Sequence, residues 1–162
     1  MLAVTYAHGA LALCTYSAAL GIFLARRGEG HWVLGVGLAV PAGLLINVAL
    51  KHLFQRVRPA FEEPLLFLTT YSFPSGHTAG TTLFYGVVTA YVFSRTRNTR
   101  VRIACVTGWA ATVVLVSFSR MYLGVHYLTD VVAATAWSLI WLALCILAVH
   151  RMQARLARRS SS

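Results

Sequence analysis

Five apolar stretches dominate this chain of 162 residues, and each has about the length that crosses a membrane as a helix. They span roughly residues 4–25, 32–50, 78–93, 103–118 and 127–149. The hydrocarbon core of a bilayer takes about 20 helical residues, and a backbone in lipid must satisfy its own polar groups. The sequence therefore predicts an all-α, polytopic transmembrane helix bundle with five spans.

The composition agrees with a membrane domain, because 58% of the residues are hydrophobic and only 11% are charged. A soluble domain is about 25% charged. We expect one transmembrane domain over residues 1–150, followed by a basic cytoplasmic tail over 151–162. Segments 78–93 and 103–118 are rich in small residues, which allow close helix packing, so we expect both inside the bundle.

The net charge of +10 lies between the apolar segments rather than on one polar face. This pattern indicates cations that flank a membrane, and no nucleic-acid partner is expected. The first, third and fifth segments are followed by ten cations, which the positive-inside tendency places in the cytoplasm. These are Arg26, Arg27, Arg95, Arg97, Arg100, Arg102, Arg151, Arg155, Arg158 and Arg159. The C-terminus is then cytoplasmic, and the loops 51–77 and 119–126 lie on the extracytoplasmic face.

The first polar cluster of these outer loops contains Lys51, Arg58 and Pro59. Lys51 and Arg58 are separated by about two helical turns, so they share a face if the second helix continues that far. Pro59 helps to end the helix, because the residue before proline avoids the helical region. Taken alone, two cations at a helix end are more typical of ordinary interfacial anchors than of a binding site.

The second cluster is Pro74-Ser75-Gly76-His77, directly before the third apolar segment. Serine is a favoured N-cap, and glycine permits close backbone approach. A helix N-terminus offers free amides and the positive end of a dipole, which suits a phosphate. The cluster is therefore either a plain helix cap or an anion site.

The third cluster contains Arg120, His126 and Asp130. His126 and Asp130 are four residues apart, so they share a helix face. Asp130 is the only acidic residue within an apolar span, and a carboxylate there indicates function by default. A carboxylate bonded to one ring nitrogen fixes the tautomer of the imidazole. The alternative is a structural polar pair between helices.

Together the three clusters resemble the three-part signature of the type-2 phosphatidic acid phosphatase family. The matching blocks are Lys51-(six residues)-Arg58-Pro59, Pro74-Ser75-Gly76-His77 and Ser119-Arg120-(five residues)-His126-(three residues)-Asp130. The family also includes vanadium-dependent haloperoxidases, which share the site in a soluble helical fold. The hydrophobicity of this chain favours the membrane branch, whose members usually have six helices, so a sixth span is possible.

The resemblance implies a mechanism through a phosphohistidine. His126 would attack phosphorus, Asp130 would orient it, and His77 would protonate the leaving oxygen and then activate water. The phosphate oxygens would be held by Lys51, Arg58, Arg120, the Ser75 hydroxyl and the Gly76 amide. No carboxylate cluster suits a hard cation, so we expect no metal and no cofactor.

The leading hypothesis is a lipid phosphatase whose partners are its lipid phosphate substrate and membrane lipids. The candidate substrates are a polyprenyl diphosphate, phosphatidylglycerol phosphate, phosphatidate or a glycolipid phosphate. The alternatives are a lipid phosphotransferase with the same intermediate and a non-enzymatic lipid-binding or transport protein. The apolar run 64–68 is expected in the membrane interface beside an acyl or prenyl chain.

Overall fold

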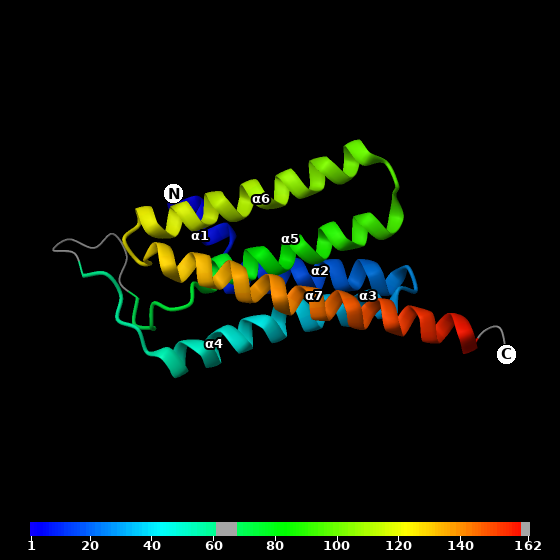
Figure 1. Ribbon diagram of the computed structural model, residues 1–162, viewed down its shortest axis with the longest axis horizontal. Helices are drawn as coiled ribbons and strands as arrows, with labels where there is room; N and C mark the ends of the chain where they lie inside the picture. The colour runs from blue at the N-terminus through cyan, green and yellow to red at the C-terminus, as the bar shows by residue number, and fades with distance from the viewer. Residues whose placement is uncertain (61–67, 160–162) are drawn as a thin grey trace.

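The computed structural model describes residues 1–60 and 68–159, and every regular element in these residues is helical (Figure 1). The elements are α1 (Leu2–Ala7), α2 (Ala10–Arg26), α3 (Gly30–Gly37), the π-helical turn η1 (Leu38–Ala42), α4 (Gly43–Phe54), α5 (Gly76–Arg95), α6 (Thr99–Tyr122) and α7 (Leu128–Arg159). Three helical stretches within the described residues are long and apolar enough to cross a membrane, namely Gly30–Phe54, Thr99–Tyr122 and Leu128–Leu156. The predicted all-α transmembrane bundle is confirmed.

The first predicted span is interrupted, which corrects the expectation of one helix over residues 4–25. The amides of His8 and Gly9 donate to the carbonyls of Thr5 and Tyr6, three residues back, and this tighter turn ends α1. Gly9 is extended and becomes the N-cap of α2. As a result, α1 and α2 are two helices, and α2 is a shorter apolar helix of 17 residues.

The second predicted span is continuous but contains a π-helical turn around Pro41. Proline lacks the amide that an α-helical ladder needs, and a π turn is one way to accommodate the gap. The Trp141 indole of α7 donates to the Leu38 carbonyl at 2.9 Å, which satisfies a backbone group in this irregular turn.

α4 ends at Phe54 because Gln55 adopts a left-handed conformation, with φ of 49°. The helix therefore stops before Arg58 and Pro59, so the condition under which Lys51 and Arg58 would share a helix face is not met. A left-handed residue at the end of a helix reverses the chain and does not require proline. Arg58 is carried by the loop that follows α4.

α5 is the central helix and packs against α2, α4, α6 and α7. Its small residues allow this: a Cβ on Gly80 would meet the Leu13 side chain at 2.6 Å, and one on Gly86 would collide with Leu142. The expected interior position of segment 78–93 is confirmed.

The expected interior position of segment 103–118 is wrong, because α6 packs on the bundle along one side. Its buried residues are Val113, Val116, Ser119 and Arg120, of which Ser119 and Arg120 lie at the end that approaches α1. The small residues of α6 largely face outward, and a Cβ on Gly108 would meet nothing within 4 Å.

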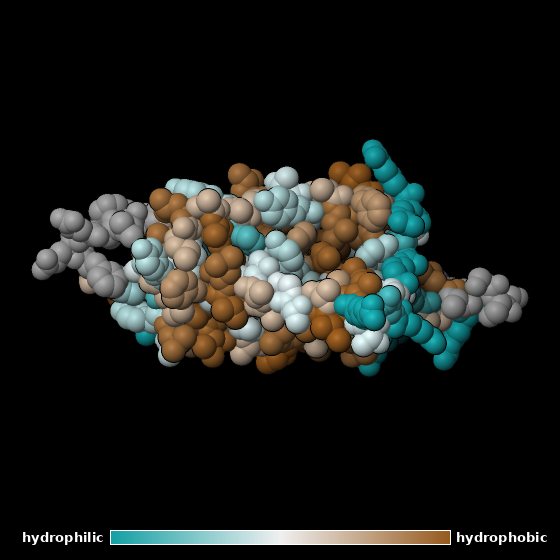
Figure 2. Space-filling view, turned by 90° about the horizontal axis from the view of Figure 1, so that it is seen from above, coloured by the Kyte–Doolittle hydropathy of each residue, from teal (hydrophilic) through white to brown (hydrophobic). Residues whose placement is uncertain are grey.

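The two ends of the bundle differ in chemistry. The α4–α5 loop, the α6–α7 turn and α1 lie at one end, while the α2–α3 turn, the α5–α6 turn and the C-terminal part of α7 lie at the other (Figure 1). Hydrophilic residues gather at this second end (Figure 2). There Glu29 forms an ion pair with Arg95 and accepts from the Tyr91 hydroxyl at 3.1 Å. The described residues of the basic segment continue α7 as far as Arg159.

Candidate active site

His126 and Asp130 form the pair that the sequence predicted. His126 lies in the turn after α6, and Asp130 is in the first turn of α7. The Nδ1 of His126 is 3.3 Å from Asp130 Oδ2, and both side chains are almost completely buried. The Tyr127 amide donates to the same oxygen at 2.9 Å. A carboxylate at Nδ1 favours the tautomer that leaves the Nε2 lone pair free.

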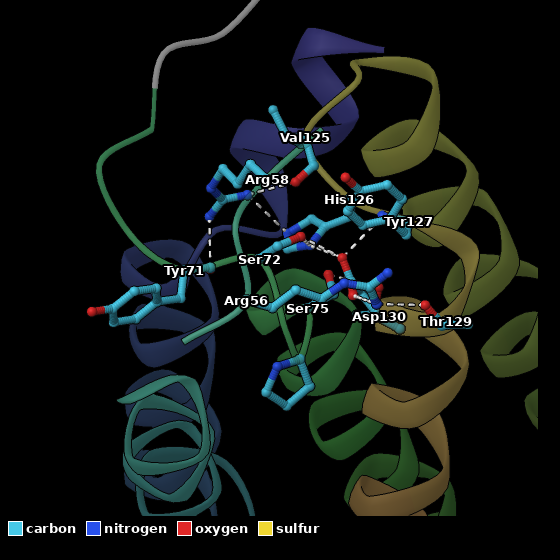
Figure 3. A network of polar contacts seen from close by, with 12 residues as sticks. Arg56, Arg58, Tyr71, Ser72, Ser75, Val125, His126, Tyr127, Thr129 and Asp130 are labelled. Carbon is cyan, nitrogen blue, oxygen red and sulfur yellow. Dashed lines mark hydrogen bonds and ion pairs between the residues drawn. The ribbon is translucent and has the colours of Figure 1, made fainter. Parts of the chain in front are cut away.

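Two residues that the sequence analysis did not single out also hold Asp130 (Figure 3). Arg56 forms an ion pair with Asp130 Oδ1 at 2.7 Å, and the Ser72 hydroxyl donates to Oδ2. Arg56 also donates to the Thr129 hydroxyl at 2.6 Å and lies 4.2 Å from the centroid of the Tyr127 ring. The carboxylate is therefore fixed from both the α4–α5 loop and the α6–α7 turn.

Arg58 reaches His126 from the same loop. Its Nη1 lies 3.5 Å from His126 Nε2 and donates to the Val125 carbonyl at 2.7 Å. Its other nitrogens donate to the Thr70 carbonyl at 2.7 Å and to the Thr70 hydroxyl at 2.9 Å. These acceptors are neutral oxygens, so they fix the guanidinium without cancelling its charge.

Lys51, in the last turn of α4, contacts the loop segment 70–72, which Arg58 also contacts. Its ammonium donates to the Tyr71 carbonyl at 2.5 Å and lies 3.4 Å from that of Ser72. Lys51 and Arg58 therefore converge on residues 70–72, although Arg58 is not helical.

Arg120 is a buried cation without a carboxylate in hydrogen-bond contact among the described residues. It is 1% exposed, at the end of α6. Its Nη1 donates to the Thr5 hydroxyl of α1 at 3.2 Å, while its Nε has no hydrogen-bond partner in the described part of the chain. An uncompensated buried charge is costly, so this guanidinium is suited to an incoming anion.

The Pro74-Ser75-Gly76-His77 block leads into α5, with Ser75 at the N-cap position. The Ser75 side chain makes no capping bond; its oxygen accepts from the Thr78 hydroxyl at 3.1 Å, and its amide donates to the Asp130 carbonyl at 3.2 Å. The capping hydrogen bond, one of the two alternatives left open by the sequence, is therefore not formed by this hydroxyl. A Cβ on Gly76 would lie 3.3 Å from the Asn47 amide nitrogen, which explains the small residue.

A cavity of about 240 Å³ brings most of the predicted site residues together. Six of the eight line it: Lys51, Arg58, Gly76, His77, Arg120 and His126. Asp130 lies behind His126, on the side away from Arg58. Ser75 is fully buried and does not line this cavity.

The cavity favours a neutral imidazole and a bound anion. Burial lowers the pKa of His126 to about 4, the hydrogen bond that His126 donates to Asp130 opposes this effect, and the nearby Arg58 and Lys51 charges add to it. His126 is therefore uncharged at neutral pH, while three cations line the same space. An uncharged imidazole oriented by a carboxylate is a competent nucleophile, and fixed cations complement a phosphoryl group.

Arg56 and Ser72 had only weak signals in the sequence. Arg56 lies two residues before Arg58, and Ser72 two residues before Pro74, so proximity to the motifs was the available indication. Neither belongs to a helix, where periodicity could have shown a shared face.

The family comparison matches residues 30–154 to the model of the PAP2 superfamily. Among curated proteins, the chain is 35% identical over 99 residues to "Phosphatidylglycerophosphatase B" of Bacillus subtilis (strain 168), an alignment that covers 59% of this chain and 47% of that protein. The chain thus spans about half the length of this relative.

A solved structure is also similar. It is described as the first transmembrane PAP2 type phosphatidylglycerolphosphate phosphatase from Bacillus subtilis. The TM-score is 0.78 at 28% sequence identity, and the match covers 89% of this chain and 72% of the other.

Proposed function

The chain belongs to the PAP2 superfamily, and on that premise we propose that it is a membrane lipid phosphatase that hydrolyses phosphatidylglycerol phosphate or a related lipid phosphate. One observation carries the proposal: His77, His126 and three cations from five different segments line one small cavity. The names of the two relatives favour phosphatidylglycerol phosphate as the first substrate to test.

The cations would bind the phosphate and stabilise its transition state. Lys51, Arg58 and Arg120 line the cavity with the Gly76 backbone, which begins α5. The helix N-terminus adds the positive end of a dipole and free amides. Such preorganised charge is the main protein contribution to phosphoryl transfer, so we propose that the reaction needs no metal and no cofactor.

In the first step, His126 Nε2 attacks phosphorus in line. A nitrogen–phosphorus bond forms as the bond from phosphorus to the lipid oxygen breaks. Burial lowers the pKa of His77 to about 3 in the substrate-free protein, so His77 takes up a proton from the entering phosphate group and gives it to that oxygen. Asp130 accepts the Nδ1–H bond of His126, and this contact strengthens as the ring becomes positive. The lipid leaves as an alcohol, or as a monophosphate if the substrate is a diphosphate.

In the second step, water attacks the phosphohistidine. His77, now neutral, takes a proton from the water, the new phosphorus–oxygen bond forms, and the bond to Nε2 breaks. The products are inorganic phosphate and the restored imidazole of His126. A lipid hydroxyl in place of water would make the enzyme a phosphotransferase, so the assay should include a labelled lipid acceptor.

The test is phosphate release by the detergent-purified protein with a chelator present. The panel contains phosphatidylglycerol phosphate, phosphatidate, a polyprenyl diphosphate and a glycolipid phosphate. We expect His126→Ala to reduce turnover to background and His77→Ala to cost roughly 100-fold. Labelled substrate should leave a phosphoenzyme in the unsubstituted protein and none in His126→Ala.

His150→Ala is the matched control, because His150 is an exposed imidazole in the C-terminal part of α7 and its ring lies beside Trp32 of α3. It should retain full turnover. Full turnover in His126→Ala would disprove the mechanism, and loss of activity with the chelator would disprove metal independence. Lipid binding without phosphate release would instead identify a non-enzymatic lipid-binding protein.

The proposed location is a cell membrane, with the cavity on the extracytoplasmic face and the C-terminus in the cytoplasm. The end that carries the cavity is opposite the end at which hydrophilic residues gather (Figure 2). The positive-inside tendency puts the arginine-rich end in the cytoplasm.

A further inference from the structure

The cavity of about 240 Å³ that His77 and His126 line is called the phosphate cavity below. A larger groove adjoins it on the side of α1 and α2. Its volume is about 670 Å³, and its lining includes Tyr6, Ala10, Leu11, Ala12, Thr15 and Tyr16. Leu11 is 82% exposed, so this wall faces the surroundings of the bundle rather than its core. At the depth of an apolar helix, those surroundings are lipid.

The groove and the phosphate cavity are neighbours that share part of their walls. Ala10, Leu68, His77 and Arg120 line both spaces. His77 and Arg120 are therefore reached from the groove as well as from the cavity. A molecule with its phosphate among the cations has a direct path into the groove.

The break between α1 and α2 shapes this path. Thr5 of α1 bonds to Ser119 at 3.0 Å and to Arg120 at 3.2 Å, which fastens α1 to α6, whereas α2 packs along α5. Gly9, at the break, brings the backbone close to His77, because a Cβ there would lie 3.8 Å from Nε2. The two helices diverge at the active site, and the groove lies beside this point.

The groove wall is apolar away from its inner end. The Thr15 hydroxyl donates to the Leu11 carbonyl at 3.0 Å, so its polarity is satisfied within the helix. Ala10, Leu11 and Ala12 add aliphatic surface, while the cations Lys51 and Arg58 remain in the phosphate cavity. The combined space is positive at one end and apolar at the other, which complements an anionic amphiphile.

A second lipid-facing groove differs from the groove beside α1 and α2 in its relation to the phosphate cavity. It measures about 540 Å³, lies between α6 and α7, and is lined by residues such as Val114 and Leu139. It shares no lining residue with the phosphate cavity. This groove therefore has no common wall through which a chain would be continuous with a phosphate in the cavity.

We propose that the groove beside α1 and α2 holds the hydrocarbon chain of the substrate while its phosphate occupies the cavity. This inference rests on the proposed function and makes the first turns of α2 the part of the chain that selects substrates by their tails. Since a lipid tail in a membrane is already in hydrocarbon, the groove orients the phosphate more than it adds affinity.

The experiment fills the groove and compares two substrates. Thr15→Trp and Ala12→Trp place an indole in the groove, at positions that do not line the phosphate cavity. The measurement is the ratio of kcat/KM for long-chain phosphatidate to kcat/KM for a water-soluble aryl phosphate. We expect this ratio to fall about tenfold or more in both variants, because misplacing a substrate by about 1 Å can cost 100-fold.

Val114→Trp is the control, because it puts the same indole on the other lipid-facing groove, where the ratio should not change. An unchanged ratio in both groove variants overturns the inference, provided that the unsubstituted protein hydrolyses both substrates. Where the unsubstituted protein prefers another lipid phosphate of the panel, that lipid replaces phosphatidate in the ratio; if it hydrolyses none of them, the proposed function itself fails.

A second measurement uses only the unsubstituted protein, so its result does not depend on whether a variant folds. A lipid phosphate with a diazirine on its chain is photo-crosslinked to the unsubstituted protein, and the labelled peptides are identified by mass spectrometry. We expect label between Tyr6 and Tyr16. Label confined to α6 and α7 would place the chain in the other groove and overturn the inference.

Discussion

At the scale of single residues, the site depends on how Asp130 is fixed. The carboxylate is fully buried and receives contacts from His126, Tyr127, Ser72 and Arg56. A buried carboxylate stays ionised only when such partners compensate for its lost hydration. Asp130 therefore acts through a small network of contacts rather than through His126 alone.

Removal of the Arg56 charge should weaken this network. We expect Arg56→Gln to lower kcat roughly tenfold with little change in KM, because a hydrogen bond to a charged group contributes about 1.5–3 kcal/mol and a tenfold rate change corresponds to about 1.4 kcal/mol. Arg56→Lys should recover part of the loss.

Arg97→Gln makes the same substitution in the exposed α5–α6 turn, at the other end of the bundle, and should leave kcat and KM unchanged. A change in KM alone would mean that Arg56 binds substrate instead of positioning Asp130.

The protonation of His126 gives a second test at this scale. Burial lowers its pKa to about 4, so the ring should remain neutral as the pH falls through 6.5 and become charged only near the lower value. The same shift makes the fold lose stability as the pH falls from 6.5 toward 4, since the unfolded chain binds the proton first.

NMR of ring-labelled histidine can measure this midpoint, with the His126 signal assigned by its absence from His126→Ala. A midpoint at or above 6.5 in the substrate-free protein would contradict the buried, uncharged imidazole.

At the scale of the elements, the central position of α5 depends on its small residues. Gly86 leaves room for Leu142 of α7 and Trp109 of α6, and Gly80 leaves room for Leu13 of α2. In membranes, where the hydrophobic effect does not drive helices together, such close packing is a main source of association. The same helix begins with the residues that line the phosphate cavity, so its packing also sets the geometry of the site.

Gly86→Ala should destabilise the bundle by roughly 1–3 kcal/mol, because the added methyl group must displace packed side chains. Thermal unfolding in detergent should show a lower midpoint. Gly108→Ala on α6 is the matched control, since its methyl group meets nothing within 4 Å, and it should leave the midpoint unchanged or slightly higher. Equal effects of the two substitutions would refute the packing argument.

At the scale of the whole molecule, the two ends of the bundle carry different polar groups and are separated by the length of the helices. The phosphate cavity lies at one end, and Glu29 with Arg95 lies at the other, next to the arginine-rich turns. This polarity gives the chain a preferred direction in a membrane that is more negative on its cytoplasmic side.

An epitope tag at the C-terminus should therefore resist protease in sealed cells and be cleaved after they are permeabilised. The reason is that, in the proposed orientation, the positive charge near the end of α7 would retain that end in the cytoplasm. A known cytoplasmic protein should behave in the same way as a marker of sealing. Cleavage of the tag in sealed cells would reverse the proposed orientation.

The helical segments and the chemistry-bearing motifs could be predicted from the sequence, because apolar length and residue spacing are local properties. They gave the all-α membrane bundle, the His126–Asp130 pair and the cations. The break at Gly9 and the end of α4 at Gln55 were missed, since each depends on one backbone conformation that no periodicity signals.

Only the tertiary structure decided which loop residues meet. Arg56 and Ser72 contact Asp130 from 74 and 58 residues away along the chain. The outward face of α6 and the groove beside α2 likewise follow from how helices pack around α5. Sequence spacing fixes neighbours along a helix, but packing between distant segments depends on side-chain shapes throughout the bundle.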